Sequence, residues 1–71
     1  MPLALIREGT KAILRSIQGG RGLRGRLAAM GLVPGAEITV LRNGGGGPFV
    51  VAVKDNRICI GRGMAMKIEV E

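Results

Sequence analysis

The 71 residues of the chain are enough for one small domain, taken as residues 1–71, with a marginal hydrophobic core. With one Cys and no His, the chain has no internal disulfide and none of the usual zinc-binding patterns. The only aromatic residue is Phe49, which disfavours binding modes that stack bases or proline-rich peptides on aromatic side chains. The net charge of +6 favours acidic groups, phosphates or anionic lipids as partners.

The acidic side chains are scattered and do not suggest a catalytic pair. They are expected at turns or on outward positions of strands, and they are Glu8, Glu37, Asp55, Glu69 and Glu71. Ser16 has no His to activate it as a nucleophile, and general acid–base catalysis needs a positioned His or converging carboxylates. We therefore expect a protein that is not an enzyme and has no cofactor or metal site, although weak surface binding of a divalent transition metal ion stays open.

The expected location is the cytoplasm, without direct insertion into a membrane. No stretch of the chain approaches the ~20 apolar residues that a membrane-spanning helix needs. Met1–Ile6 is too short for a signal peptide and lacks its charged start. A lone thiol, Cys59, fits a reducing compartment.

The chain opens with a short helical turn and a strand. In Met1–Gly9, Pro2 suits the first position of a helical turn, and Leu3 and Ile6 would share its buried face. Lys11–Ile17 predicts the first strand. Both faces of this strand carry apolar residues, so we expect each face to be partly buried.

A short helix is predicted next, over 23–30. Leu23, Leu27 and Met30 follow the spacing of one helix face and are expected to enter the core. Gly31 can take the left-handed conformation that ends a helix. Pro34-Gly35 fits the central positions of a type II turn, which leads into the second strand.

Short strands and turns make up the rest of the chain. Strands are expected over 36–42, 49–54, 57–61 and 67–71, with a glycine-rich hairpin loop at 43–48, a tight turn at Asp55-Asn56 and a turn at 64–66. The glycine-rich loop precedes a strand rather than a helix, which argues against a phosphate site. The pattern predicts an all-β fold: a small, SH3-like, partly open barrel of about five strands, with one short helix between the first two.

The centre of the chain resembles the FeoA family of small SH3-like proteins. The family pattern is roughly Arg-Leu, two residues, Leu/Met-Gly-Leu/Met, one residue and Pro-Gly. It is met at Arg26, Leu27, Met30, Gly31, Leu32, Pro34 and Gly35. The resemblance extends over the whole chain, although the glycines of the 44–47 loop depart from the usual link.

The resemblance implies a non-catalytic, cytosolic accessory or regulatory protein of bacterial ferrous iron uptake. Its implied partner is the cytosolic, GTPase-bearing region of the FeoB membrane transporter. The candidate partner-binding residues combine basic side chains, expected to meet acidic groups, with apolar side chains expected to project from a rigid turn. They are Arg21, Arg24, Arg26, Leu32, Val33 and Pro34. The loop over 44–48 is a second candidate surface.

Two other hypotheses stay open on the residues alone. A basic SH3-like module of the translation type would bind nucleic acid, which the charge favours and the near absence of aromatic residues disfavours. Self-association into homo-oligomers through exposed Val and Ile is compatible with the transport role.

Overall fold

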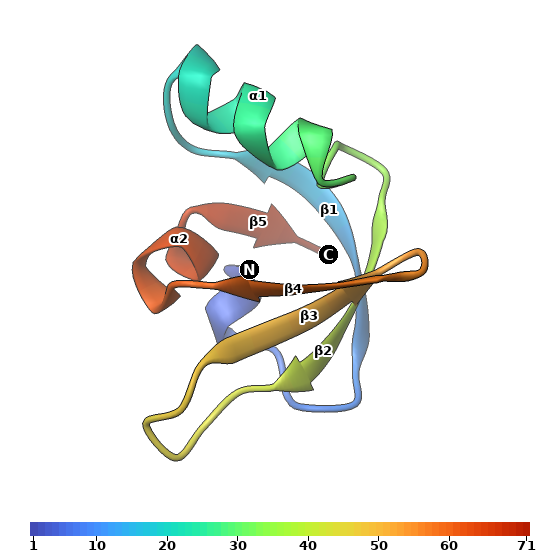
Figure 1. The fold of residues 1–71 in the computed structure, drawn as a ribbon, viewed down its shortest axis with the longest axis vertical. Helices are drawn as coiled ribbons and strands as arrows, with labels where there is room; N and C mark the ends of the chain where they lie inside the picture. The colour runs from blue at the N-terminus through green and yellow to red at the C-terminus, as the bar shows by residue number, and fades with distance from the viewer.

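Five antiparallel strands form one open sheet in the order β4-β3-β2-β1-β5, in a computed structural model that describes residues 1–71. Figure 1 shows the sheet curving round a common core, with the longer helix set to one side. The elements in chain order are η1 (Leu3–Leu5), β1 (Lys11–Ile17), α1 (Arg21–Ala29), β2 (Glu37–Arg42), β3 (Phe49–Val53), β4 (Asn56–Ile60), α2 (Arg62–Met66) and β5 (Ile68–Val70). The predicted all-β class, with one helix between the first two strands, is confirmed.

Strand β1 divides the sheet into two parts. Its first half pairs with β2, from Lys11 to Ile13, and its second half pairs with β5, from Leu14 to Ile17. The register with β5 shifts between Leu14 and Ser16. An irregularity of this kind bends a strand and increases its twist, which lets one short sheet wrap round a core.

The core is entirely apolar, and β1 contributes only one of its two faces to it. Ala12 and Leu14 are buried, whereas Ile13 on the opposite face is 38% exposed. The prediction that both faces of this strand are partly buried is therefore wrong for its first half. In its second half, Ile17 is half-buried against the core, after the register shift between Leu14 and Ser16. The largest fully buried side chains are Phe49, Leu3, Leu14, Leu32, Ile38, Ile68, Val40, Val51, Val53 and Val70.

The predicted turns are mostly confirmed. Gly31 has a φ of +92°, as its position after α1 requires. Gly35 also has a φ of +92°, and the N–H of Ala36 donates to the carbonyl of Val33 at 2.9 Å, as in a type II turn centred on Pro34-Gly35. The β3–β4 connection is a two-residue hairpin as predicted, but it consists of Lys54-Asp55 rather than Asp55-Asn56, because Val53 pairs with Asn56.

The helical turn predicted at the start of the chain is confirmed, whereas the segment before β5 differs from the prediction. The opening segment forms a single 3-10 turn, η1, with Leu3 buried beneath it. Near the end, α2 covers five residues, where only a bend and a turn over 64–66 were expected. Neither α1 nor α2 has the length and apolar character of a membrane-spanning helix.

Candidate partner-binding groove

A groove runs between α1 and the second half of β1. Its volume is about 440 Å³, and it is lined by Ser16, Ile17, Arg24, Gly25, Ala28, Leu32, Val33 and Pro34. Helix α1 lies across the end of β1 (Figure 1). The groove therefore brings together four of the six candidate residues, namely Arg24, Leu32, Val33 and Pro34.

The groove exists because α1 presents small side chains to it. Gly25 and Ala28 are three residues apart and lie on one side of the helix. A Cβ at Gly25 would meet nothing within 4 Å. The large side chain of Leu27 turns into the core instead and is buried. The helix is thus anchored by Leu27 and leaves open space beside it.

Leu32 forms the floor of the groove rather than a projecting contact. The N–H of Gly31 donates to the carbonyl of Ala28 at 2.9 Å, and the N–H of Leu32 donates to the carbonyl of Leu27 at 2.9 Å. These two bonds define a Schellman motif, in which the second residue after the helix packs back on its last turn. Leu32 is accordingly fully buried, and the expectation that it projects for partner contact is wrong.

The same motif explains why Met30 does not enter the core. Met30 is the C-cap of α1 and is 39% exposed. The prediction that it belongs to the buried face of the helix is wrong. Once the chain reverses at Gly31, Leu32 fills the space under the helix end, and Met30 remains on the surface.

The turn after the helix supplies a rigid apolar rim. Val33 is 41% exposed, and Pro34 is exposed beside it. The turn is held to the sheet by a bond of 2.7 Å from the N–H of Gly35 to the carbonyl of Leu14. A rim that is already ordered loses little conformational entropy when it contacts a partner.

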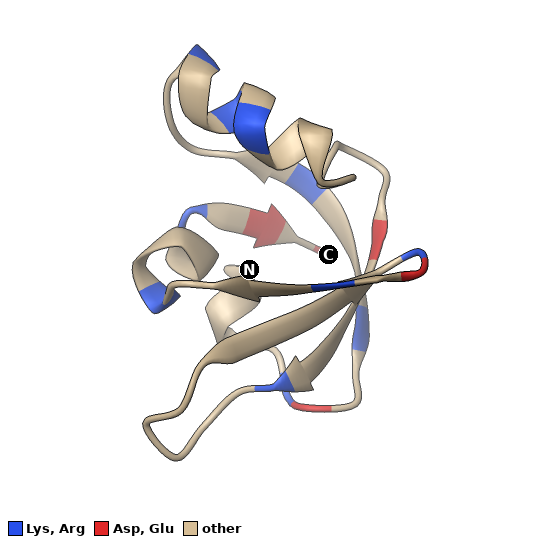
Figure 2. Cartoon of the chain, in the orientation of Figure 1, with Lys and Arg blue, Asp and Glu red and all other residues tan.

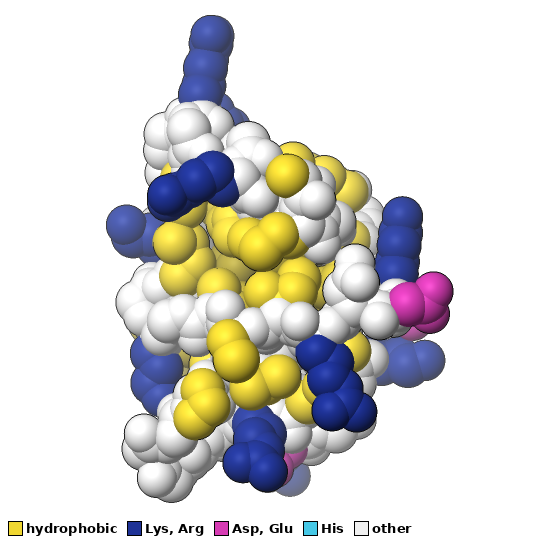
Figure 3. Space-filling view, in the orientation of Figure 1, with side chains coloured by type: hydrophobic (Ala, Val, Ile, Leu, Met, Phe, Trp, Pro, Cys, Tyr) yellow, Lys and Arg dark blue, Asp and Glu magenta, His cyan; other side chains and the backbone are white.

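The three arginines of α1 are exposed but are not gathered at one point. Arg24 lines the groove, whereas Arg21 and Arg26 lie outside it. Figure 2 shows Lys and Arg on α1 with no acidic residue on that helix, and Figure 3 shows basic side chains around an apolar area of the surface. None of the three arginines forms an ion pair within the chain, whose pairs join Lys11 to Glu37, Arg15 to Glu71 and the amino group of Met1 to Glu69.

The groove combines an apolar hollow with the guanidinium group of Arg24, which has no acidic partner within the chain. This arrangement is suited to binding. No group of three or more His, Cys, Asp or Glu side chains could hold a metal ion. The second candidate surface, the loop over 44–48, lies beyond the far ends of β2 and β3, away from α1 (Figure 1). The groove and the loop are therefore two separate surfaces.

Comparison with known proteins gives the family. The FeoA domain model matches residues 1–71. A candidate Fe(2+) transport protein A of Methanocaldococcus jannaschii is 44% identical over 70 residues, which cover 99% of this chain and 84% of the relative. The chain belongs to the FeoA family.

Solved FeoA structures have the same fold. The crystal structure of an iron uptake regulatory protein, FeoA, superposes with a TM-score of 0.90 at 40% identity, covering 99% of this chain and 93% of the other. FeoA of Stenotrophomonas maltophilia, solved with zinc and described as a prokaryotic SH3 domain protein, superposes with a TM-score of 0.87 at 28% identity over 100% and 89% of the two chains. The predicted SH3-like architecture is thereby confirmed.

Sequence reasoning missed four residues of the groove, namely Ser16, Ile17, Gly25 and Ala28. The sequence pattern placed Ser16 and Ile17 in a strand, but it did not show that α1 lies beside this part of the strand. The spacing of Gly25 and Ala28 was a usable signal, because two small residues at i and i+3 leave one side of a helix open to a neighbour. The order Leu27-x-x-x-Gly31-Leu32 also carried the signal for a buried Leu32.

Proposed function

We propose that this FeoA-family protein is a non-catalytic accessory of ferrous iron transport that binds the cytosolic, GTPase-bearing region of the FeoB transporter through the groove between α1 and β1. The observation that carries this proposal is the grouping of Arg24, Val33 and Pro34 around one apolar hollow. Family membership supports the transport role, and the groove supports the mode of contact.

The groove favours an apolar side chain of the partner with a carboxylate close to it. Complete burial of one aliphatic side chain contributes roughly 1.5–3 kcal/mol. Arg24 can form a bidentate, charge-assisted pair with the carboxylate, which adds orientation as well as energy. Arg21 and Arg26 extend the positive field on either side and would raise the rate of association with an acidic surface.

Calorimetric titration against the cytosolic region of FeoB from the same organism, with and without guanine nucleotide, tests the proposal. Arg24→Glu is expected to weaken binding about tenfold, or roughly 1.4 kcal/mol. Arg42→Glu is the matched control, because Arg42 is an exposed arginine at the end of β2 and has no carboxylate partner. Equal weakening by the two variants would mean that net charge, and not the groove, governs the interaction.

The shape of the groove is tested separately from its charge. Gly25→Ala adds a methyl group at a residue that lines the groove, and Gly22→Ala adds one a turn earlier in the same helix, at a residue that does not line it; both positions have open space. We expect only Gly25→Ala to weaken binding. Val33→Asp probes the rim, and Leu32 is unsuited to this purpose because it is buried.

Nucleic-acid binding is the second candidate function. Of the eleven Lys and Arg side chains only Lys11 and Arg15 pair with carboxylates, which leaves a large positive charge available. This mode predicts an affinity for bulk RNA that falls steeply with salt. A gel shift at two salt concentrations checks it, and a free RNA band at low salt would exclude it.

A further inference from the structure

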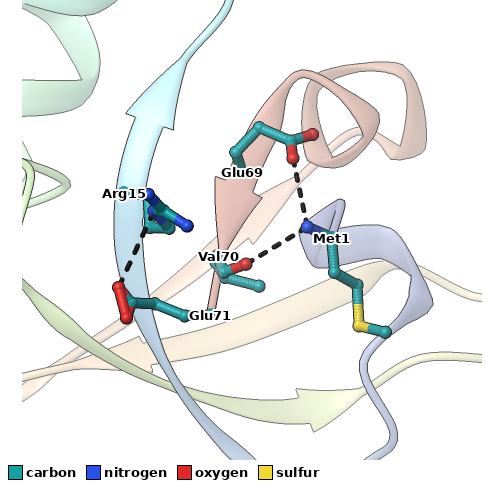
Figure 4. A network of polar contacts seen from close by, with 5 residues as sticks. All are labelled: Met1, Arg15, Glu69, Val70 and Glu71. Carbon is teal, nitrogen blue, oxygen red and sulfur yellow. Dashed lines mark hydrogen bonds and ion pairs between the residues drawn. The ribbon is translucent and has the colours of Figure 1, made fainter.

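The two edge strands of the sheet, β5 and β4, differ in whether their outer backbone groups have a neighbour. At the β5 edge, Pro2 bridges Glu69, and the N–H of Val70 donates to the carbonyl of Met1 at 2.8 Å. The amino group of Met1 also lies 3.1 Å from Oε1 of Glu69 and 3.3 Å from the carbonyl oxygen of Val70 (Figure 4). The opening residues therefore occupy this edge, whereas β4, at the opposite end of the strand order, has a neighbour on one side only.

The hairpin register shows which backbone groups of β4 are unpaired. The two-residue connection Lys54-Asp55 makes Val53 and Asn56 a hydrogen-bonded pair, and such pairs alternate with non-hydrogen-bonded ones along an antiparallel ladder. Ile58 and Ile60 therefore bond to β3. The N–H and C=O groups of Arg57 and Cys59 point away from β3, and no bond outside the ladder engages them.

A hollow lies beside this edge. Its volume is about 610 Å³, and it is bounded by the end of α1 and by β4 with its turn, at Ala29, Met30, Asp55, Asn56, Arg57, Ile58 and Cys59. Met30 is exposed and Ile58 is half-buried. Apolar side chains fill the surface between α1 and β4 in Figure 3. An extra strand on β4 would thus have both backbone partners and an apolar surface.

The charge around the edge favours an acidic occupant over a second copy of this chain. Lys54 and Arg57 are exposed and unpaired, and Asp55 is the one acidic residue at the hollow. Two copies pairing through β4 would bring together two chains that each carry a net charge of +6. Repulsion of that kind disfavours self-association.

We propose that the free edge of β4 binds an extended segment of a partner protein in which acidic and apolar residues alternate. The segment adds a sixth strand, with its backbone bonded to Arg57 and Cys59. Its acidic side chains lie on the outer face beside Arg57, and its apolar side chains face Ile58 and Met30. This strand-addition site is separate from the α1–β1 groove and does not depend on the identity of the partner that the groove binds.

The probe is an acetylated and amidated six-residue peptide of alternating Glu and Val, titrated into the ¹⁵N-labelled protein. Binding is expected to shift the amide resonances of Arg57 and Cys59 most and to slow their hydrogen exchange at least tenfold. A peptide of the same sequence with alternate amides N-methylated is expected to bind at least tenfold more weakly. Shifts centred on Arg24 and Val33, or equal affinity for the two peptides, would overturn the proposal.

Substitution of Cys59 tests the backbone contact directly. Cys59→Pro removes one outward N–H, and proline is tolerated on an edge strand where its nitrogen faces away from the sheet. Cys59→Ala removes only the thiol. We expect the proline variant to stay folded and to bind at least tenfold more weakly, and the alanine variant to bind normally.

Unchanged affinity of a folded Cys59→Pro variant overturns the proposal. If that variant unfolds, the N-methylated peptide tests the backbone contact on the wild-type protein. The alanine variant then shows whether the thiol of Cys59 contributes to binding. Sedimentation of the free protein completes the test, because dimers that disappear with Cys59→Pro would show that β4 is occupied by a second copy and not by an acidic peptide.

Discussion

Gly31 determines how α1 ends and therefore what forms the floor of the groove. Its positive φ lets the chain reverse, so that Leu32 packs back under the helix and Met30 stays outside. A Cβ at this position would also approach Cγ1 of Val53 to 3.3 Å. One residue thus connects the end of a helix, the core and the groove.

Gly31→Ala is expected to destabilise the protein by roughly 1–2 kcal/mol, because an L-residue is strained at this φ. Gly22→Ala is the matched control inside α1, where a Cβ meets nothing, and it should stabilise by about 0.5–1 kcal/mol. Urea unfolding measures both. Destabilisation of similar size by the two variants would contradict the role given to the Schellman motif.

At the scale of elements, the turn of the β3–β4 hairpin holds a non-glycine residue in a strained backbone conformation. Lys54 is the one non-glycine residue with a positive φ, +56°. Only the first of the two connecting residues is in this conformation, as in a type II′ turn, for which Gly is the preferred residue. The register of β4, and hence the outward direction of the Arg57 and Cys59 amides, depends on this turn.

Lys54→Gly is expected to raise the free energy of unfolding by roughly 0.5–1 kcal/mol, because glycine removes the strain without changing the register. Lys54→Ala keeps the strain and serves as the control, with a change near zero. Thermal unfolding at matched salt concentration checks both. A loss of stability with glycine would show that the lysine side chain contributes more than its backbone costs.

At the scale of the molecule, Asn43 joins three segments that are distant in sequence. Its Nδ2 donates to the carbonyls of Ala4 at 2.9 Å and Ile6 at 2.7 Å, and its Oδ1 accepts from Arg62 at 2.8 Å. Its backbone N–H donates to Oε2 of Glu8 at 2.9 Å. The opening turn, the end of β2 and the start of α2 are held together at this one half-buried side chain.

Asn43→Ala is expected to cost roughly 1–3 kcal/mol, since it leaves two partly buried carbonyls without a donor. Asn56→Ala is the control, because Asn56 is exposed and its side chain makes no hydrogen bond in the chain. Denaturant unfolding followed by circular dichroism provides the comparison. Equal stability of the two variants would show that the packing of Leu3 alone holds the opening segment.

The local pattern of the sequence was sufficient for the five strands, for α1 and for most turns, but it did not show that α2 is a helix or that Met30 stays outside the core. Strand alternation, Gly31 and Pro34-Gly35 are effects of neighbouring residues on one another, and each was predicted within one or two positions. Arg24, Val33 and Pro34 were likewise identified as candidates from their local pattern. The motif around Arg26 and Gly31 pointed to the family before any fold was known.

Tertiary structure alone decided which face of each element is covered. The pattern of β1 is apolar on both sides, and only the sheet's curvature determines that Leu14 is inside and Ile13 outside. The groove, the closed β5 edge and the open β4 edge depend on contacts between residues far apart in the chain. Such contacts follow from the packing of the whole core, which the alternation of neighbouring residues does not encode.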